Sequence, residues 1–369
     1  MTLDQPAVHR REDLPLHGVR VVEIASFISV PLAGSMLRHL GAIVLKVEPA
    51  SGDAFRRFGL TYRGMSATWA NANQGKRSRF LDLKSAEGRG ELDALLETAD
   101  VVLQNLRPEA SAALGLDGAT LASQFPRLIQ VALSGYGDSG PKSSLPVFDG
   151  LIQAATGMAA AESDVRPLPT RAYVVDKISA LFVTQSVLAA LVARETTGRG
   201  SRVDLAMLDI MAFFNFPDHG QDRTFLPPAP LRDEKPARGG FLRAADGYIA
   251  VVPVAGRHVL ACLDVVGHPE WRDRLKACPN TVELTALLYE LMESETQRRP
   301  VREWEALFKA HDVPATGVLS FDQHLADPQT LHNRIYAEEE GPLGPMRTVR
   351  YPARIDGRYL PTDPTWDDT

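Results

Sequence analysis

Short apolar runs alternate with helical patterns in the first part of the chain. The β-branched run 19–25 predicts a buried strand, and the apolar positions that follow Pro31 recur at helical spacing. Gly41 ends this helix, and the run 43–47 predicts a second buried strand. A strand, a helix and another strand within about 30 residues form a βαβ unit with parallel strands. The chain therefore begins with a right-handed parallel crossover.

The same alternation continues further along the chain. A helix is expected at about 86–98, before an apolar strand at 101–105, and a further strand is expected at 128–133. From Asp176 to Val192 the apolar positions follow helical spacing, which predicts a long, largely buried helix. The predicted fold class is α/β, with a parallel, doubly wound sheet.

A proline-rich stretch divides the sequence. Residues 227–230 read PPAP and are followed by Gly239 and Gly240, which makes this segment the best candidate for a linker. Between residues 240 and 326 the pattern shows one strand, at 247–252, and several short helices. These elements are enough for a small α+β domain.

Composition and charge exclude several classes of protein. The 40 Lys and Arg residues are scattered and the net charge is −6, so no nucleic-acid surface is expected. Cys262 and Cys278 have neither metal-ligand nor disulfide spacing, which indicates a reduced, cytoplasmic setting without a metal site. No run of about 18 apolar residues stands out, so no membrane partner is expected.

The first strand-to-helix turn is the usual place for a dinucleotide fingerprint. Residues 26–34 read SFISVPLAG and lack the three spaced glycines. The main sequence evidence for an NAD-binding site is therefore missing. A helix that starts near Pro31 still offers free N–H groups to a phosphate or thioester oxygen. A plain corner between strand and helix explains this turn equally well.

Five segments of the chain carry short motifs in a characteristic order. They are LHGVRVVE at 16–23, LGA, KVEP and GD within 40–53, GKRS and LDLK within 75–84, ADVV and NLRP within 99–108, and SGYG and GP within 134–141. Together they resemble the family III CoA-transferases, also called the CaiB/BaiF or formyl-CoA transferase group. Segments 26–34 and 69–78 are locally more similar to mesaconyl-CoA and related dicarboxylate CoA-transferases, which suggests short branched or unsaturated dicarboxylic acids as substrates.

The resemblance implies an architecture that pattern alone does not give. Members of this family form an interlocked homodimer in which each ring-shaped subunit threads the other. Residues 1–225 and 327–369 would form a large Rossmann-like CoA-binding domain, and 226–326 the small α+β domain. The partners implied are an acyl-CoA and a carboxylic acid. CoA enters as substrate, and no tightly bound cofactor is expected.

The resemblance places the catalytic aspartate of the family at Asp176. An aspartate at the start of a helix is also an ordinary N-cap, and both interpretations stay open. An unperturbed pKa of about 3.9 would leave the Asp176 nucleophile ionised without a base. Gly239 and Gly240 match, in shortened form, the glycine loop that covers this aspartate in formyl-CoA transferase, but they are also typical of a hinge.

The family's CoA contacts transfer onto four further segments. Lys84 and Arg107 suit the phosphates of CoA, although lone basic residues are commonly solvated surface charges. The remaining positions fall in the first turn and after three later strands. The full set comprises Ile28, Ser29, Leu81, Asp82, Leu83, Lys84, Asn105, Leu106, Arg107, Phe148 and Asp149.

Two alternatives remain at this point. The 2-methylacyl-CoA racemases share the fold and the aspartate, but their catalytic histidine falls on Phe148, which cannot accept a proton. A catalytically degenerate CoA-binding protein is suggested by Ile28, Val30 and Ala180, where formyl-CoA transferase has Gln, Gly and Gly. Because Asp176 is retained, the sequence favours the transferase.

Overall fold

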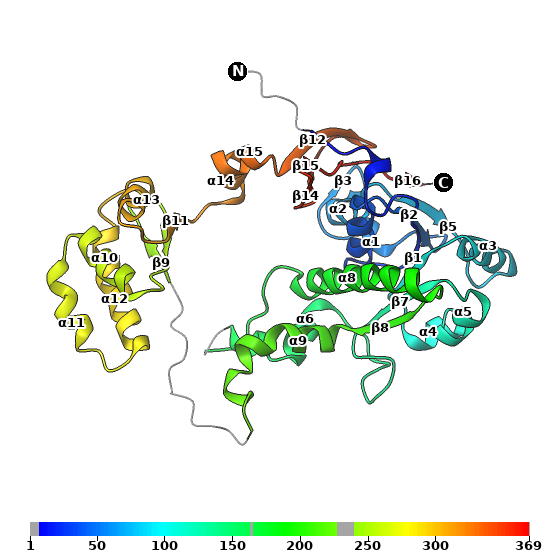
Figure 1. The fold of residues 1–369 in the computed structure, drawn as a ribbon, viewed down its shortest axis with the longest axis horizontal. Coiled ribbons are helices and arrows are strands. Elements are labelled where there is room, and N and C mark those ends of the chain that lie inside the picture. The colour runs from blue at the N-terminus through cyan, green and yellow to red at the C-terminus, as the bar shows by residue number, and fades with distance from the viewer. Residues whose placement is uncertain (1–6, 163–164, 227–239, 369) are drawn as a thin grey trace. The chain divides into compact units, whose positions relative to one another are not determined.

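The computed structural model describes residues 7–162, 165–226 and 240–368. These residues fall into two compact units (Figure 1). The first contains Met1–Gln221 and Arg334–Thr369, and the second contains Asp222–Asn333. The chain therefore leaves the first unit once and returns to it for its last 36 residues.

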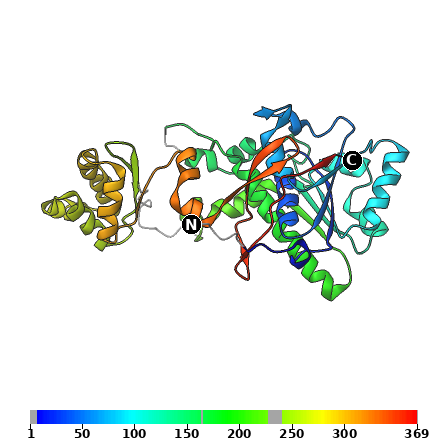
Figure 2. The ribbon, with the colours of Figure 1, turned by 90° about the horizontal axis from the view of Figure 1, so that it is seen from above.

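A seven-stranded sheet organises the first unit. All of its strand pairs are parallel, and the order is β16-β5-β2-β1-β6-β7-β8. The C-terminal strand reaches the edge of the sheet beside β5 (Figure 2). The predicted parallel sheet is confirmed. Its strands are β1 (Arg20–Ile24), β2 (Ile43–Glu48), β5 (Arg77–Phe80), β6 (Val101–Gln104), β7 (Ile129–Ser134), β8 (Arg202–Ala206) and β16 (Asp367–Asp368).

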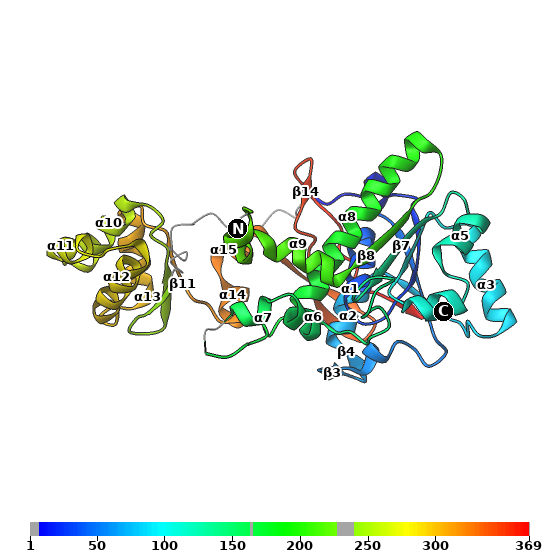
Figure 3. The same cartoon turned by 90° about the horizontal axis from the view of Figure 1, so that it is seen from below.

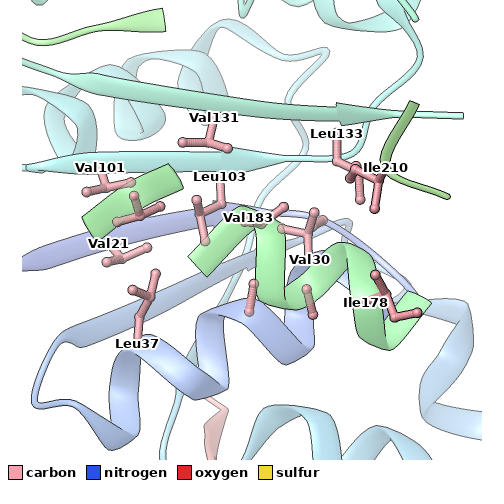
Figure 4. Close-up of a cluster of buried hydrophobic side chains, with 14 of the residues drawn as sticks. Val21, Val30, Leu37, Val101, Leu103, Val131, Leu133, Ile178, Val183 and Ile210 are labelled. Atoms are coloured by element: carbon pink, nitrogen blue, oxygen red, sulfur yellow. The ribbon is translucent and has the colours of Figure 1, made fainter. Parts of the chain in front are cut away.

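Helices cover both faces of this sheet. Helices α1 (Ser29–His39) and α8 (Val174–Thr197) lie on one face, and α3 (Ala86–Glu97) and α5 (Gly118–Gln124) on the other (Figure 3). Successive strand residues serve opposite faces: Val21 packs in the cluster beneath α1 and α8, and Val22 packs in the cluster beneath α3. Figure 4 shows the first cluster, in which Leu37 and Val183 meet the side chains of β1, β6 and β7.

Shorter elements complete the first unit. They include two antiparallel hairpins near the chain's return and the helices that follow β6 and β7. Their bounds are η1 (Arg11–Asp13), η2 (Ala54–Arg57), β3 (Thr61–Tyr62), β4 (Met65–Ser66), α2 (Ala67–Asn73), α4 (Pro108–Ala113), α6 (Asp149–Ala155), α7 (Met158–Ala161), α9 (Met207–His219), β12 (Tyr336–Gly341), β13 (Gly344–Val349), β14 (Arg354–Ile355) and β15 (Arg358–Tyr359).

The sequence-based expectations need correction at several helix starts and strands. Helix α1 begins at Ser29, two residues before Pro31, and α8 begins at Val174, so Asp176 is its third residue instead of its cap. Strands β5 and β8 were not predicted. Both carry charged residues because they lie near the sheet edges, where one face is less deeply covered.

The second unit has a core of its own around Leu242, Ile249, Trp304 and Phe308. It contains a three-stranded antiparallel sheet, so the expectation of one strand was wrong. The two missed strands are only four and three residues long. The elements are η3 (Gln221–Arg223), at the junction with the first unit, β9 (Gly240–Arg243), β10 (Tyr248–Val251), α10 (Gly256–Val266), η4 (Pro269–Trp271), α11 (Arg272–Lys276), α12 (Thr281–Thr296), α13 (Val301–Ala310), β11 (Ala315–Gly317), α14 (Phe321–Ala326) and α15 (Pro328–Asn333).

Helix α8 is, within the described part of the chain, the one helix long and apolar enough to cross a membrane. The central helix of a protein core passes the same test. Val175, Val183 and Val187 are fully buried in the cluster against the sheet, so α8 is such a core helix.

Candidate active site

A cavity of about 570 Å³ lies at the carboxyl edge of the parallel sheet. Its walls are the segments that follow β1, β2 and β5, together with Leu106 beyond β6. The strand order reverses between β1 and β6, because the chain first adds β2 and β5 on one side and then β6 on the other. Ligands of open α/β sheets bind at such a switch point. Topology therefore makes this cavity the first candidate for a ligand site.

Five of the predicted CoA contacts line this cavity: Leu81, Asp82, Leu83, Lys84 and Leu106. Lys84 is exposed and forms no ion pair with any residue that the structure describes. The side chain of Asp82 accepts a hydrogen bond from the Lys84 backbone N–H at 3.0 Å, which fixes the loop. Lys84 thus lies in the wall of the cavity with its side chain exposed to solvent.

The other predicted contacts serve different purposes in the structure. Arg107 is exposed at the start of α4. Asn105 uses its side chain on the backbone of Ser26, accepting from its N–H at 3.1 Å and donating to its carbonyl at 2.8 Å. Ile28 is buried with Phe55 and Trp69, so only its backbone is available to a ligand.

Phe27 stands at the centre of the turn between β1 and α1. Its φ of 65° is left-handed, which is strained for a bulky residue and is common at functional sites. Its ring lies 5.4 Å from that of Phe148 in an edge-to-face arrangement and 5.6 Å from that of Phe55. Phe27 also lines the cavity, so this aromatic contact connects the cavity to the start of α6.

Buried charges fix the turn from beneath. The carboxylate of Glu23 is fully buried and pairs with Lys46 Nζ at 3.0 Å and Lys76 Nζ at 2.7 Å. Lys46 also donates to the carbonyl of Ala25, and Lys76 to that of Pro31, each at 2.6 Å. Burial, opposed by Glu23, lowers the pKa of Lys76 to about 8. The two lysines thus hold both ends of the turn that carries Phe27 and Ser29.

Asp176 lies where three helices begin. Asp149 is the first residue of α6, Ser29 is the first of α1, and Asp176 is in the first turn of α8. The Asp176 backbone N–H donates to Asp149 Oδ2 at 3.1 Å, so Asp149 caps α8 from another helix. Helix N-termini favour negative charge, which suits a site where oxyanions develop.

The environment of Asp176 changes its protonation. Burial, and then the neighbouring Asp149 carboxylate, raise the pKa of Asp176 to about 7, while a hydrogen bond from the Ser29 hydroxyl opposes the rise. The expectation of an ordinary pKa was therefore wrong. Sequence could not have shown the shift, because it depends on two residues brought next to Asp176 by folding.

The glycine pair is only partly described. Gly239 lies outside the described residues, and Gly240 begins β9 in the second unit. A Cβ at Gly240 would lie 3.1 Å from the ring of Tyr289, so close packing gives this glycine a local structural reason. Across the described ranges, no group of three or more His, Cys, Asp or Glu could hold a metal ion.

Two side chains at this site were not singled out from the sequence. The sequence gives no signal for the role of Phe27, because the left-handed conformation of a bulky residue cannot be inferred from the neighbouring residues. Gln153 is fully buried and donates to Asp149 Oδ1 at 2.5 Å. Its position four residues after Asp149 on one helix face is a signal that sequence reasoning could have used.

Comparison with known proteins shows the family to which the chain belongs. Residues 16–367 match the family described as CoA-transferase family III. The chain belongs to the family III CoA-transferases. This transferase is 30% identical to a probable fatty acyl-CoA transferase of Mycobacterium tuberculosis, with 95% of this chain and 94% of that protein covered. It is 28% identical to a succinate–glutarate CoA-transferase of Agrobacterium fabrum, with 85% and 82% covered.

A second dicarboxylate enzyme is matched over about half of the chain. This transferase is 38% identical to the beta subunit of a succinyl-CoA–L-malate CoA-transferase of Chloroflexus aurantiacus, over 53% of this chain and 50% of that subunit. Among solved structures, the M. tuberculosis protein superimposes with a TM-score of 0.83 at 29% identity, covering 99% and 98% of the chains. A CaiB/BaiF family protein from Brucella suis gives a TM-score of 0.82 at 26% identity, with 95% of each chain covered.

Proposed function

We propose that this transferase moves CoA from an acyl-CoA to a carboxylic acid through a covalent aspartyl-CoA thioester on Asp176. The observation that carries the proposal is the convergence of three helix N-termini on one partly buried carboxylate. The contact between Phe27 and Phe148 connects the start of α6 to the cavity at the sheet switch point. A carboxylate is the nucleophile that can be acylated, converted to a thioester and then restored.

The proposed sequence of bonds is balanced at every step. The Asp176 carboxylate attacks the thioester carbonyl, the C–S bond breaks, and CoA thiolate leaves a mixed anhydride. The thiolate attacks the aspartyl carbonyl of that anhydride, which releases the donor acid as its carboxylate and leaves aspartyl-CoA. The acceptor carboxylate then attacks this thioester, and the same steps in reverse give the new acyl-CoA and free Asp176.

We assign the cavity to CoA, with Lys84 and Arg107 placed to meet its phosphates and Phe148 beside the thioester. The partial likeness to a succinyl-CoA–L-malate transferase supports a short dicarboxylate as one of the acids. The reaction would take place in the cytoplasm, where the two free cysteines stay reduced.

The acylation rate is expected to rise with pH through a midpoint near 7. Only the ionised Asp176 attacks, and its pKa is raised to about 7, so protonation removes the nucleophile as the pH falls. The check is the single-turnover rate of adduct formation between about pH 5 and 9. In Asp149→Asn the midpoint should move down, because the neighbouring negative charge is gone. A rate that does not change over this range would contradict the assignment.

Removal of either proposed phosphate contact should weaken CoA binding. Lys84→Ala and Arg107→Ala are each expected to raise the KM for acyl-CoA about 5- to 10-fold with little change in kcat, as a lost charge-assisted hydrogen bond would. The matched control is Arg199→Ala, at the end of α8 just before β8 begins and thus at the opposite edge of the sheet. Equal KM values for acyl-CoA in all three variants would contradict the assignment of the cavity to CoA.

We further propose an interlocked homodimer. Apolar side chains on α8 and α9 are exposed in the single chain, among them Leu181, Val192, Phe213 and Phe216. A second copy of the chain would cover them. Sedimentation at submicromolar concentration should show a dimer that does not dissociate without unfolding, because interlocking couples folding to association. A stable folded monomer would rule this out.

A further inference from the structure

The Asp149–Asp176 pair is connected to a third, buried side chain. Gln153 is 1% exposed and lies one helical turn after Asp149 on α6. Its Oε1 accepts from the backbone N–H of Thr170 at 2.9 Å, and its Nε2 donates to Asp149 Oδ1 at 2.5 Å. A chain of hydrogen bonds thus runs from the loop before α8, through α6, to the first turn of α8.

The direction of this chain is fixed by its two ends. A backbone N–H can only donate, so Thr170 requires the oxygen of the Gln153 amide to face it. The NH₂ group must then face Asp149, whose Oδ1 becomes an acceptor. The other end is the Asp176 backbone N–H, which makes Asp149 Oδ2 an acceptor as well. Both oxygens of Asp149 are therefore occupied as acceptors, which is the hydrogen-bond pattern of an ionised carboxylate.

We propose that Gln153 is a positioning residue that fixes Asp149 as the charged member of the pair, so that proton and acyl group are both directed to Asp176. This inference rests on the proposed function. Two adjacent carboxylates repel each other when both are ionised, and one of them then holds the proton. Because both oxygens of Asp149 accept hydrogen bonds, the carboxyl group that holds the proton is that of Asp176. The acylated Asp176 carries no charge, so the same arrangement favours the covalent adduct over the free carboxylate.

Other charges do not compete for this role. Burial and Asp149 are the influences that raise the pKa of Asp176, and the Ser29 hydroxyl is the one that lowers it. Beneath the start of α1, the buried Glu23 pairs with Lys46 and Lys76. The other charged side chains, near the starts of α6, α8 and α9, are exposed to solvent, which screens them. They are Glu162, Arg171, Lys177 and Asp209.

The test is the pH dependence of single-turnover acylation in the full-length enzyme, read as adduct on the tryptic peptide 172–177. That peptide contains Asp176, and Asp149 lies on the separate peptide 143–171. In Gln153→Met, Asp149 loses the donor that fixes it as the charged member of the pair, so the midpoint of acylation should fall by about one pH unit. In Gln153→Glu, the introduced carboxyl group can donate to Asp149 only while the introduced group is protonated. The rise of the acylation rate at acid pH should therefore stay as in the wild type, and the rate should fall at alkaline pH.

The matched control is Gln130→Met, which alters a buried glutamine on β7 and should leave the midpoint unchanged. A purely structural role for Gln153 would lower the rate at every pH without moving the midpoint. If both Gln153 variants form the adduct with the wild-type pH profile, the inference is overturned while the proposed function stands. If the wild-type enzyme forms no adduct on peptide 172–177, the proposed function itself fails.

Discussion

Replacing Asp176 with alanine is expected to slow CoA transfer about a thousandfold or more. Removing the nucleophile closes the covalent path, which corresponds to about 4 kcal/mol of lost transition-state stabilisation. The measurement is the turnover of acyl-CoA with a panel of carboxylic acids, followed by mass spectrometry. Hydroxylamine should also trap a hydroxamate on peptide 172–177 of the wild-type enzyme and none on that of the variant.

Folding is expected to survive this change. The side chain of Asp176 does not cap α8, because Asp149 accepts the hydrogen bond from the Asp176 backbone, and alanine keeps that N–H. The matched control is Asp209→Ala, which removes an exposed aspartate from the first turn of α9 and should keep full activity. Near-native transfer by Asp176→Ala, or an adduct on peptide 143–171, would show that another residue is the nucleophile.

Replacing Glu23 with leucine is expected to destabilise the protein by about 3–5 kcal/mol. The change removes the carboxylate that pairs with Lys76, while Lys46 keeps Asp53 at 3.3 Å. An uncompensated buried charge is among the costliest defects in a protein core. The measurement is the midpoint of urea unfolding at fixed protein concentration. Activity should also fall in whatever protein remains folded, because these lysines hold the turn that carries Ser29.

Two further variants separate this effect from a general loss of charge. Glu12→Leu removes an exposed carboxylate that pairs with Arg10 on the surface, and should leave the midpoint of urea unfolding almost unchanged. The double variant Glu23→Leu with Lys76→Met should recover part of the stability, since apolar residues can replace a buried ion pair. Equal stability of Glu23→Leu and Glu12→Leu would show that the buried charges do not depend on Glu23.

The sequence by itself determined the class of fold and the position of the central strands. Strands β1, β2, β6 and β7 lie in the middle of the sheet and are buried on both faces, so each is a largely apolar run. Strands β5, β8 and β16 lie toward the edges, carry charged residues and give no such signal. The ordered motifs of the first half also pointed to the family that the comparisons show.

Only the tertiary structure decided the chemistry at Asp176. Asp149 and Ser29 lie 27 and 147 positions away in the sequence, and folding brings both against its carboxyl group. The resulting pKa of about 7 follows from burial and from a second negative charge, which depend on distance through space. The strained turn at Phe27 and the orientation of the Gln153 amide have the same origin: each is fixed by partners from other elements, which the local sequence does not contain.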